Sequence, residues 1–351
     1  MGNVIAASQK SSAKIEDKIN VSTLPPDPPV NMGLESRLNS DIYLGSTPSS
    51  FTEANLEDSQ IGTIQSPGTV EDLHKKCKDL FPSVFEGAKL IVSNGINNHF
   101  QLSHTFTLSS EGGSGYRFGG TYVGTKMIGP NEAYPILQGD IDPRGNINST
   151  VIHQFGPKLT SRLSVQIQNG KLSASQLTND YKGDNCTCSL ALANLDISKR
   201  AGVFVAHYLQ SVSSNLALGS ELVYQCGRNV PGGEMTMLSA VARYSLGDIV
   251  VSGALGAESI HTYYYQKVNE ELQVGVELET NYSLKGSTLS VGYQYDLPVT
   301  DTCFRGTIDS NGTVGAVLEK KLNPLPFTFL LSGVMSHKQK QFKLGCGLII
   351  G

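Results

Sequence analysis

Residues 270–298 read EELQVGVELETNYSLKGSTLSVGYQYDLP, two runs of alternating side chains separated by a polar turn at Asn281–Gly286. In the first run, aliphatic residues occupy every second position from Leu272 to Leu278, and glutamates such as Glu277 fall between them. In the second run, apolar residues from Leu289 to Leu297 alternate with polar ones. Period-two alternation places the two sets on opposite faces of a β-strand. The stretch therefore predicts a hairpin with one apolar face and one polar face.

The same alternation recurs between residues 85 and 350. Each strand with its turn takes roughly 10 to 15 residues, which allows about nineteen strands, within the range of membrane barrels. Besides the first hairpin, the expected strands lie at or around Leu90–Val92, Phe100–Leu108, Tyr116–Tyr122, Gln138–Asp142, Asn146–Phe155, Leu163–Ile167, Leu190–Leu195, Val203–Leu209, Leu216–Tyr224, Leu238–Leu246, Ile249–Leu255, Thr262–Gln266, Phe304–Ile308, Val314–Leu318, Phe327–Val334 and Phe342–Ile350.

A membrane barrel explains this pattern better than a soluble β-sandwich does. Charged residues make up only 17% of the chain, and they fall mostly in phase with the polar face. Lipid offers no water to an open strand edge, so a sheet in a bilayer must close on itself. No run of about eighteen apolar residues is present that would predict a spanning helix. The sequence therefore predicts an all-β fold, a transmembrane antiparallel β-barrel of about nineteen strands around a water-filled lumen.

Two details of the apolar face need attention. His104 and His153 fall on the side predicted to face lipid, where polar groups are unfavourable. The run Tyr263, Tyr264 and Tyr265 is a candidate for an interfacial aromatic girdle.

The first 68 residues differ from the rest. They are polar, with a Pro-rich knot at Pro25–Pro29 and no sustained period, so we expect a disordered arm over residues 1–68. Residues 69–82 predict one amphipathic helix, because Thr69 and Asp72 fit a capping box and Pro82 stops the run. Residues 83–351 form the expected barrel. The apolar stripe of the helix consists of Val70, Leu73, Cys77 and Leu80.

Composition and motifs argue against several functions. The net charge of −4 gives no basic footprint for nucleic acid. The six cysteines show no paired framework, and Cys186 and Cys188 lack a second ligand pair at zinc spacing. Nothing resembles a nucleophile–base pair or a phosphate-binding loop. We expect no enzymatic activity, no cofactor and no metal site. Without an apolar secretory segment, we also expect a reducing compartment of synthesis.

Seven acidic residues fall on the polar side of the predicted strands. They are candidates for a discontinuous track that binds basic cargo in the lumen: Asp140, Asp142, Glu221, Glu271, Glu277, Glu279 and Asp296. The alternative is a solvated wall whose charge is balanced by Arg117, Arg162, Arg243, Arg305 and Lys343. An exposed ion pair contributes at most about 1 kcal/mol, so a useful track needs several weak sites in series. Composition alone leaves both interpretations open.

The last predicted strand carries a further pattern. In KLGCGLII, residues 343–350, a polar residue, a glycine and two apolar residues stand at Lys343, Gly345, Leu348 and Ile350. This order resembles the insertion signal read by the outer-membrane machinery for barrel assembly, which adds such a strand to its own open edge. The alternative is an ordinary last strand.

Several longer motifs carry a specific resemblance. They are MGNVIAAS at the start, PGTVEDLHKKCKDLFP at the helix, and HYLQS, ELVYQ, LQVGVE, GYQYDLP and VGAVLEKKLNPLP in the barrel. On these motifs the chain resembles the channel-forming subunit of the protein translocase of the mitochondrial outer membrane, the TOM complex, in the mitochondrial porin superfamily. The resemblance implies nineteen strands, with the first and last parallel, a disordered arm on the cytosolic side and a helix from residue 70 that lines the lumen.

The same resemblance implies a function. It implies a channel that passes unfolded mitochondrial precursor proteins from the cytosol to the intermembrane space, with positively charged presequences following acidic patches. Asp140 and Asp142 sit where the family carries such a patch. The implied partners, besides the lipid bilayer, are precursor proteins, a second copy of the chain, the central single-span receptor subunit, small tail-anchored subunits and the precursor receptors. The arm departs from relatives with long Pro-rich tracts.

Two other functions remain as alternatives. A voltage-dependent anion and metabolite porin of the same membrane would share the fold and the pattern of the last strand. The arm, the helix and a lumen that is not predominantly basic favour the translocase over that porin. A soluble β-rich adhesion module is the third class, and it would not require a membrane.

Overall fold

A computed structural model describes residues 66–110, 114–129, 132–196, 201–227, 230, 232–282 and 285–351. Nearly all of the expected arm, residues 1–68, lies outside these residues. The described residues form nineteen strands and one α-helix, α2. The strands are β1 Gly87–Asn97, β2 Phe100–Leu108, β3 Gly115–Gly129, β4 Glu132–Ile141, β5 Ile147–Gln154, β6 Leu159–Gln168, β7 Lys171–Lys182, β8 Cys186–Asp196, β9 Ala201–Ser211, β10 Leu216–Cys226, β11 Glu234–Leu246, β12 Ile249–Leu255, β13 Ser259–Lys267, β14 Leu272–Asn281, β15 Gly286–Leu297, β16 Thr302–Asp309, β17 Thr313–Lys321, β18 Phe327–Ser336 and β19 Gln341–Ile350.

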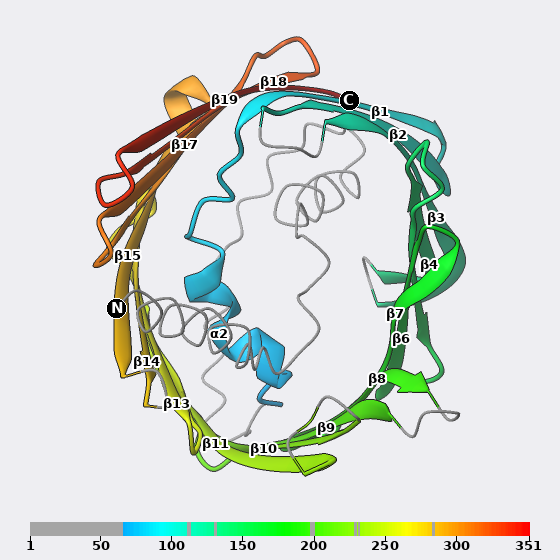
Figure 1. Cartoon of the computed structure of the whole chain (residues 1–351), viewed down its shortest axis with the longest axis vertical. Helices are drawn as coiled ribbons and strands as arrows, with labels where there is room; N and C mark the ends of the chain where they lie inside the picture. The colour runs from blue at the N-terminus through cyan, green and yellow to red at the C-terminus, as the bar shows by residue number, and fades with distance from the viewer. Residues whose placement is uncertain are drawn as a thin grey trace, which may run out of the picture. The chain divides into compact units, whose positions relative to one another are not determined.

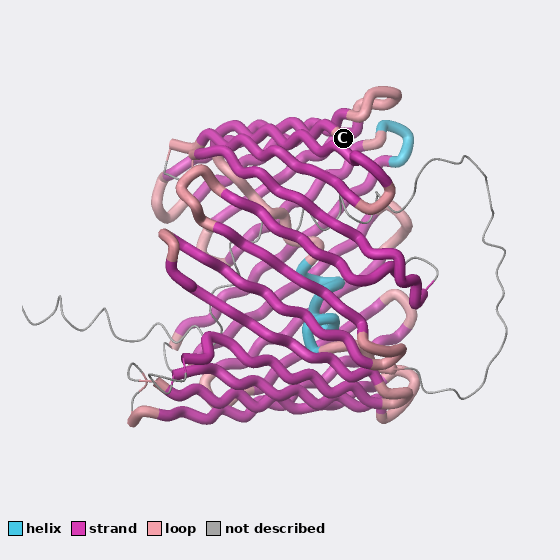
Figure 2. The backbone as a smooth tube through the Cα atoms, turned by 90° about the vertical axis from the view of Figure 1, so that its right-hand side faces the viewer, coloured by secondary structure: helices cyan, strands magenta, loops and turns pink. Residues whose placement is uncertain are grey.

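The nineteen strands close into one barrel. Each strand pairs antiparallel with the next along the chain, and β1 pairs with β19 to complete the ring (Figure 1). That closing pair is parallel and runs over six residue pairs, from Gly87 with Gly345 to Val92 with Ile350. Figure 2 shows the strands running obliquely around the wall, as closure of a barrel requires. The predicted fold class, including the parallel first and last strands, is confirmed.

The two faces of the wall differ as the alternation predicts. Side chains on one face pack against α2, which Figure 1 shows inside the ring of strands, so this is the inner face. On the opposite face, large apolar side chains are exposed, including Leu238, Leu246 and Leu163. Soluble monomers rarely expose apolar surface on this scale. The outer face therefore has the character of a lipid-facing surface.

Among the described residues, no helix is long and apolar enough to cross a bilayer.

Helix α2, Val70–Lys78, begins where the sequence predicts. Thr69 is its N-cap, and its hydroxyl oxygen accepts the backbone N–H of Asp72. The Asp72 carboxylate in turn accepts the Thr69 backbone N–H and hydroxyl. This reciprocal arrangement is a capping box, and it satisfies donors that a helix start leaves unpaired. The predicted apolar stripe is buried, because Val70, Leu73, Cys77 and Leu80 are each less than a tenth exposed.

The stripe of α2 packs on the inner wall. Val70 and Leu73 form a buried cluster with Leu209, Ala217 and Val241 of strands β9 to β11. Further along the helix, the His74 imidazole makes a 2.8 Å hydrogen bond to the Ser252 hydroxyl of β12. Its ring also lies 4.3 Å from the ring of Tyr263 on β13.

A row of small residues on the wall receives the segment that follows the helix. Gly275, Gly292, Thr307 and Gly315 are directly opposite one another across β14 to β17. A side chain at Gly275 would meet Leu80 and Cys77, one at Gly292 would meet the Phe81 ring, and one at Gly315 would meet Val84. The glycines are therefore needed for close approach. We call residues 66–86 the strap, because they run along the inner wall from Thr187 of β8 to Ser332 of β18.

The predicted aromatic girdle is wrong for two of its three tyrosines. Tyr263 is not part of a girdle, because its side chain faces the lumen against His74 and is only 5% exposed. Tyr265 shares this inner face, so of the three tyrosines only Tyr264 faces outward.

The two histidines on the lipid-facing side have local partners. The His104 imidazole makes a 2.7 Å hydrogen bond to the Tyr116 hydroxyl, and the His153 ring stands edge-on to Phe155 at 4.7 Å.

Strand β7 was not predicted. The register shifts where Gln166 pairs with Ala174 and Ile167 pairs with Leu172, which marks a bulge. Because of the bulge, Leu172 and Leu177 share a face although they are five positions apart, so the strand does not follow one strict alternation of apolar and polar residues.

We predict that Gly275→Val displaces the strap. The added side chain would overlap Leu80 and Cys77, and overpacking of this kind costs roughly 1–3 kcal/mol. Trypsin should then cleave at the exposed Lys75, Lys76 and Lys78 faster than in the unmodified protein, as measured by mass spectrometry. The control is Gly333→Val, since nothing lies within 4 Å of a side chain built there. Equal cleavage of both variants would contradict a seated strap.

Candidate functional site: the acidic inner wall

The seven predicted acids lie in four separate places rather than along one line. One group is at the end of β4, one residue is on β10, one group is on β14, and one group lines a cavity at the ends of β14 to β17. In that order they are Asp140 and Asp142, then Glu221, then Glu277 and Glu279, and finally Glu271 and Asp296. The wall therefore carries these acids as four discrete groups.

The acids at the end of β4 are held by basic partners. The Asp140 carboxylate lies 3.2 Å from the Arg117 guanidinium and accepts a 3.1 Å hydrogen bond from the Asn148 amide. Asp142 was predicted to lie in the strand. Strand β4 ends at Ile141, however, so Asp142 lies in the following turn. There its carboxylate accepts the backbone N–H of Arg144 at 2.7 Å, a bond that lowers the pKa of Asp142. This group is largely neutralised within the protein.

Glu221 on β10 has a histidine partner. Its carboxylate lies 2.9 Å from Nε2 of His207, the residue directly opposite on β9. Glu221 is therefore paired with a neighbouring side chain of the wall.

Glu277 and Glu279 lie beside the helix. They are opposite Tyr263 and His261 of β13, on the same face as the wall residues that bind α2. Burial, together with the nearby Glu277 carboxylate, raises the pKa of the Cys77 thiol in α2 to about 11. The same side of the helix region carries Lys78, whose ammonium lies 5.6 Å from the Tyr263 ring. These acids therefore face the lumen next to basic residues of the strap.

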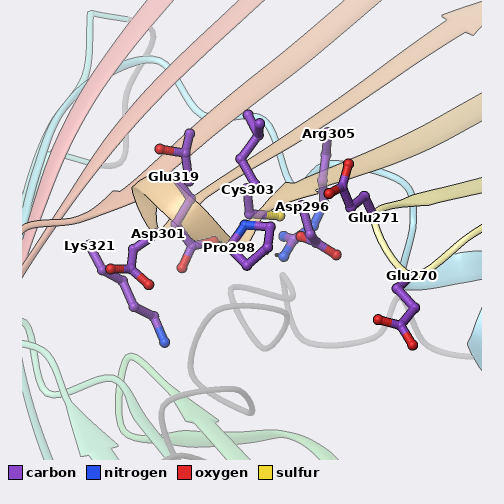
Figure 3. Close-up of a pocket in the computed structure, with 11 residues that line it drawn as sticks. Glu270, Glu271, Asp296, Pro298, Asp301, Cys303, Arg305, Glu319 and Lys321 are labelled. Atoms are coloured by element: carbon purple, nitrogen blue, oxygen red, sulfur yellow. Dashed lines mark ion pairs between the residues drawn. The ribbon is translucent and has the colours of Figure 1, made fainter.

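The last group is the most acidic. Glu271 and Asp296 line a cavity of about 740 Å³ together with Glu270, Asp301 and Glu319. Only two basic residues, Arg305 and Lys321, line the same cavity, so acids outnumber bases there (Figure 3). Arg305 is buried, and its guanidinium donates to Gln294 at 3.1 Å and lies 3.8 Å from Glu319. The Arg305 charge is thus directed into the wall.

Neutral donors hold the two predicted acids of this cavity. The Asp296 carboxylate accepts a 2.7 Å hydrogen bond from the Gln294 amide, and Glu271 accepts one of 3.2 Å from the Tyr295 hydroxyl. Such bonds orient the carboxylates without removing their charge. A cavity of this composition can bind ammonium or guanidinium groups of an extended chain.

Sequence reasoning found Glu271 and Asp296 but missed their neighbours Glu270, Asp301 and Glu319. Glu319 alternates with Leu318 in β17, so its inward position could have been inferred from the pattern. Glu270 and Asp301 lie outside the strands, where alternation gives no information.

The predicted assembly signal is divided between the two faces of β19. Lys343 and Gly345 are on the inner face, since Gly345 lies opposite the inward Ser332. Leu348 and Ile350, at odd spacing from Gly345, are on the outer face.

Within the described ranges, no cluster of three or more histidine, cysteine, aspartate or glutamate side chains is arranged to hold a metal ion.

A closed wall of strands, apolar outside and polar inside around a lumen, defines a membrane channel of the porin type. Residues 66–345 match the family described as eukaryotic porin. The chain is 50% identical to "Mitochondrial import receptor subunit TOM40 homolog 2" of Drosophila melanogaster, over 88% of this chain and 91% of that protein. It is 44% identical to the human "Mitochondrial import receptor subunit TOM40 homolog" over 94% of this chain and 90% of that protein. The Xenopus laevis homologue is 42% identical over the full length of both chains. The chain therefore belongs to the eukaryotic porin family and, within it, to the TOM40 homologues.

We predict that α2 loosens from the wall in acid. Burial, with Lys78 and His261 nearby, lowers the pKa of His74 to about 4, so the docked helix carries a neutral imidazole at pH 7. A solvated histidine has a pKa near 6.5, so the released helix binds more protons between the two values. The docked state is therefore fully favoured above about pH 6.5 and loses stability as the pH falls toward 4. An acid-tolerant lysine-specific protease should therefore cleave at Lys75 and Lys76 faster as the pH falls from 6.5 toward 4.

The control for this prediction is His74→Gln, which keeps a hydrogen-bonding side chain near Ser252 but does not titrate. Its cleavage should not depend on pH between 4 and 6.5. An identical acid response in both proteins would show that His74 is not the responsible group.

Proposed function

We propose that this protein is the protein-conducting channel of the mitochondrial outer membrane, a β-barrel that passes unfolded precursor proteins from the cytosol to the intermembrane space. The observation that carries the proposal is the identity of 42–50% to TOM40 homologues, each named a mitochondrial import receptor subunit. The matched region includes the helix and the barrel. We assign the chain to the outer membrane on the same ground.

The inner wall suits an extended, positively charged cargo. The cavity at the ends of β14 to β17 has five acids against two bases, and one of those bases, Arg305, is buried. Glu277 and Glu279 lie further along β14, and their side chains share the inner face of the wall with Gln294 and Arg305. Weak sites in series let a chain bind and leave, because no single contact is strong. We therefore assign presequence binding first to Glu271 and Asp296, and next to Glu277 and Glu279.

The remaining predicted acids have a smaller role in this proposal. Asp140 is paired with Arg117, and the Asp142 carboxylate accepts the backbone N–H of Arg144 within its turn. The Glu221 carboxylate lies 2.9 Å from the His207 imidazole. We infer that these three mainly solvate the wall.

Assembly partners and chain organisation are part of the proposal. The relatives are named as subunits of an import receptor, which supports membership of a complex. A second copy of the chain, a central single-span receptor subunit, small tail-anchored subunits and precursor receptors are the partners we propose. We also propose the division into an arm over 1–68, a lumen helix over 69–82 and a barrel over 83–351. The signal residues Lys343, Gly345, Leu348 and Ile350 would be read during insertion.

The alternative is an anion and metabolite porin, which the eukaryotic porin match alone would allow. The acidic cavity argues against anion selectivity, because carboxylates disfavour anions in a pore. The two functions differ in their response to peptide. In a planar bilayer, a presequence peptide should block the current of a translocase and have no effect on a metabolite porin.

We predict that neutralising the cavity weakens this block. Glu271→Gln with Asp296→Asn should raise the dissociation rate of a presequence peptide severalfold, since each lost contact to a cation is worth up to about 1 kcal/mol. Glu277→Gln with Glu279→Gln should have a smaller effect in the same direction. Added salt should reduce the block of the unmodified channel and narrow these differences.

The matched control is Glu234→Gln, which removes one acid from the outer face, where Glu234 accepts the Tyr224 hydroxyl. It should leave the block unchanged. A channel that no presequence peptide blocks would contradict the proposed function, whereas a block insensitive to all of these variants would contradict only the assigned binding residues.

A further inference from the structure

The closing pair of strands differs from every other pair of the wall. Consecutive strands follow one another along the chain, but β1 and β19 are its first and last strands, and their partners Gly87 and Gly345 are 258 positions apart. Their parallel pairing extends over six residue pairs, as few as between β4 and β5 and fewer than the eleven between β10 and β11. Parallel pairing is also slightly less stable per residue than antiparallel pairing. The seam between β1 and β19 is therefore the place where the ring most needs support from outside the strands.

Phe85 and Glu86, the last two residues of the strap, cross this seam on its inner side. They directly precede β1, and their polar contacts are with β18 and β19. The Phe85 backbone N–H donates to the Ser332 hydroxyl of β18 at 3.0 Å, and Ser332 is fully buried. The Glu86 carboxylate lies 3.9 Å from the Lys343 ammonium of β19.

The Phe85 side chain fills a site that two glycines of β19 leave open. A side chain built at Gly345 would lie within 3 Å of the Phe85 carbonyl oxygen and ring, and one at Gly347 would lie 3.2 Å from the ring. The ring also packs against the buried cluster of Ile91, Leu330 and Ile349, which come from β1, β18 and β19. One aromatic residue thus joins the three strands on both sides of the seam.

We propose that Phe85 and Glu86 form an inner clasp that holds the barrel shut at the seam, and that Lys343 and Gly345 are its receptor on the last strand. These two receptor residues are the polar residue and the glycine of the sequence pattern at residues 343–350. In the finished barrel the glycine is required by the Phe85 backbone and ring, and the lysine pairs with Glu86. The inward half of the pattern therefore serves closure, while Leu348 and Ile350 face the lipid.

The clasp also gives an order to the last step of folding. The receptor is complete only once β18 and β19 are paired, because Ser332 and Leu330 belong to β18. Docking of Phe85 then places Gly87, two residues later, opposite Gly345, which is the first pair of the seam. Pairing can proceed from there to Val92 and Ile350 with the register already set. The clasp thus selects the parallel register rather than a slipped one.

The test is hydrogen exchange, followed by mass spectrometry, on the full chain refolded in detergent without any other protein. Phe85→Ala should increase exchange of the backbone amides of residues 87–92 and 345–350 by more than about tenfold, because seam opening then no longer breaks a buried aromatic contact. Exchange in β10 and β11 should stay unchanged. Gly345→Ala should act in the same way, since its methyl group displaces Phe85.

The matched control is Phe81→Ala. It removes the same side chain from the same strap, but Phe81 packs on Gly292 of β15, away from the seam. It should leave exchange at the seam unchanged. Equal effects of Phe81→Ala and Phe85→Ala on the seam, or no effect of Phe85→Ala, would overturn the proposal.

A disulfide across the seam provides the second arm. Ala88 lies directly opposite the native Cys346, so Ala88→Cys places two thiols across the closing pair on the outer face. Oxidation of this pair in the Phe85→Ala background should restore slow exchange at the seam. Failure to restore it would show that Phe85 acts elsewhere.

If Phe85→Ala does not fold, Phe85→Leu, which keeps part of the apolar contact, should raise seam exchange by a smaller factor. Unchanged exchange at the seam in that variant would overturn the proposal equally.

Discussion

A strand edge cannot stay unpaired in lipid, and this requirement governs the rest of the structure. Each N–H and C=O of a spanning strand needs a partner within the sheet, so the sheet has to close. With nineteen strands joined one after another, the first and last necessarily run in the same direction, which makes the closing pair parallel. The alternation of side chains follows from the same closure, because every residue then faces either the bilayer or the lumen. A single bulge, as between β6 and β7, is enough to change the parity of a strand.

The inner wall is asymmetric because the strap occupies part of it. Apolar residues of α2 bury themselves against β9 to β11, and glycines of β14, β15 and β17 make room for the residues that follow. The polar side of α2, with Lys75, Lys76 and Lys78, then faces the lumen. Acidic residues at the ends of β14 to β17 lie on the wall beyond the helix. A cationic chain in this lumen would meet repulsion from the helix and attraction from the cavity, which directs it along one side.

Much of the fold could be predicted from the sequence, because alternation is a local property. The hairpin of β14 and β15 and the N-cap of α2 at Thr69 are found where the residues indicate. The arrangement of the acids could not be predicted in the same way. Alternation assigns Glu271 and Asp296 to a face, but their meeting with Glu319 depends on the register of four strands. Tyr263 was misplaced for a similar reason, since three consecutive tyrosines cannot share a face. The contact of Tyr263 with His74 shows that Tyr263 and Tyr265 turn inward.

The central claim is that odd and even side chains of each strand face opposite media. The chain contains no tryptophan, so a single Leu238→Trp or Ser239→Trp substitution in β11 gives a fluorophore without background. Leu238 is on the exposed apolar face, and Ser239 lies opposite Glu221 on the inner face. Fluorescence quenching should be measured in vesicles with brominated lipid chains and, separately, with aqueous iodide. The account predicts strong quenching by the lipid for Leu238→Trp and by iodide for Ser239→Trp. Similar quenching of both variants by brominated lipid, or the reverse assignment, would contradict it.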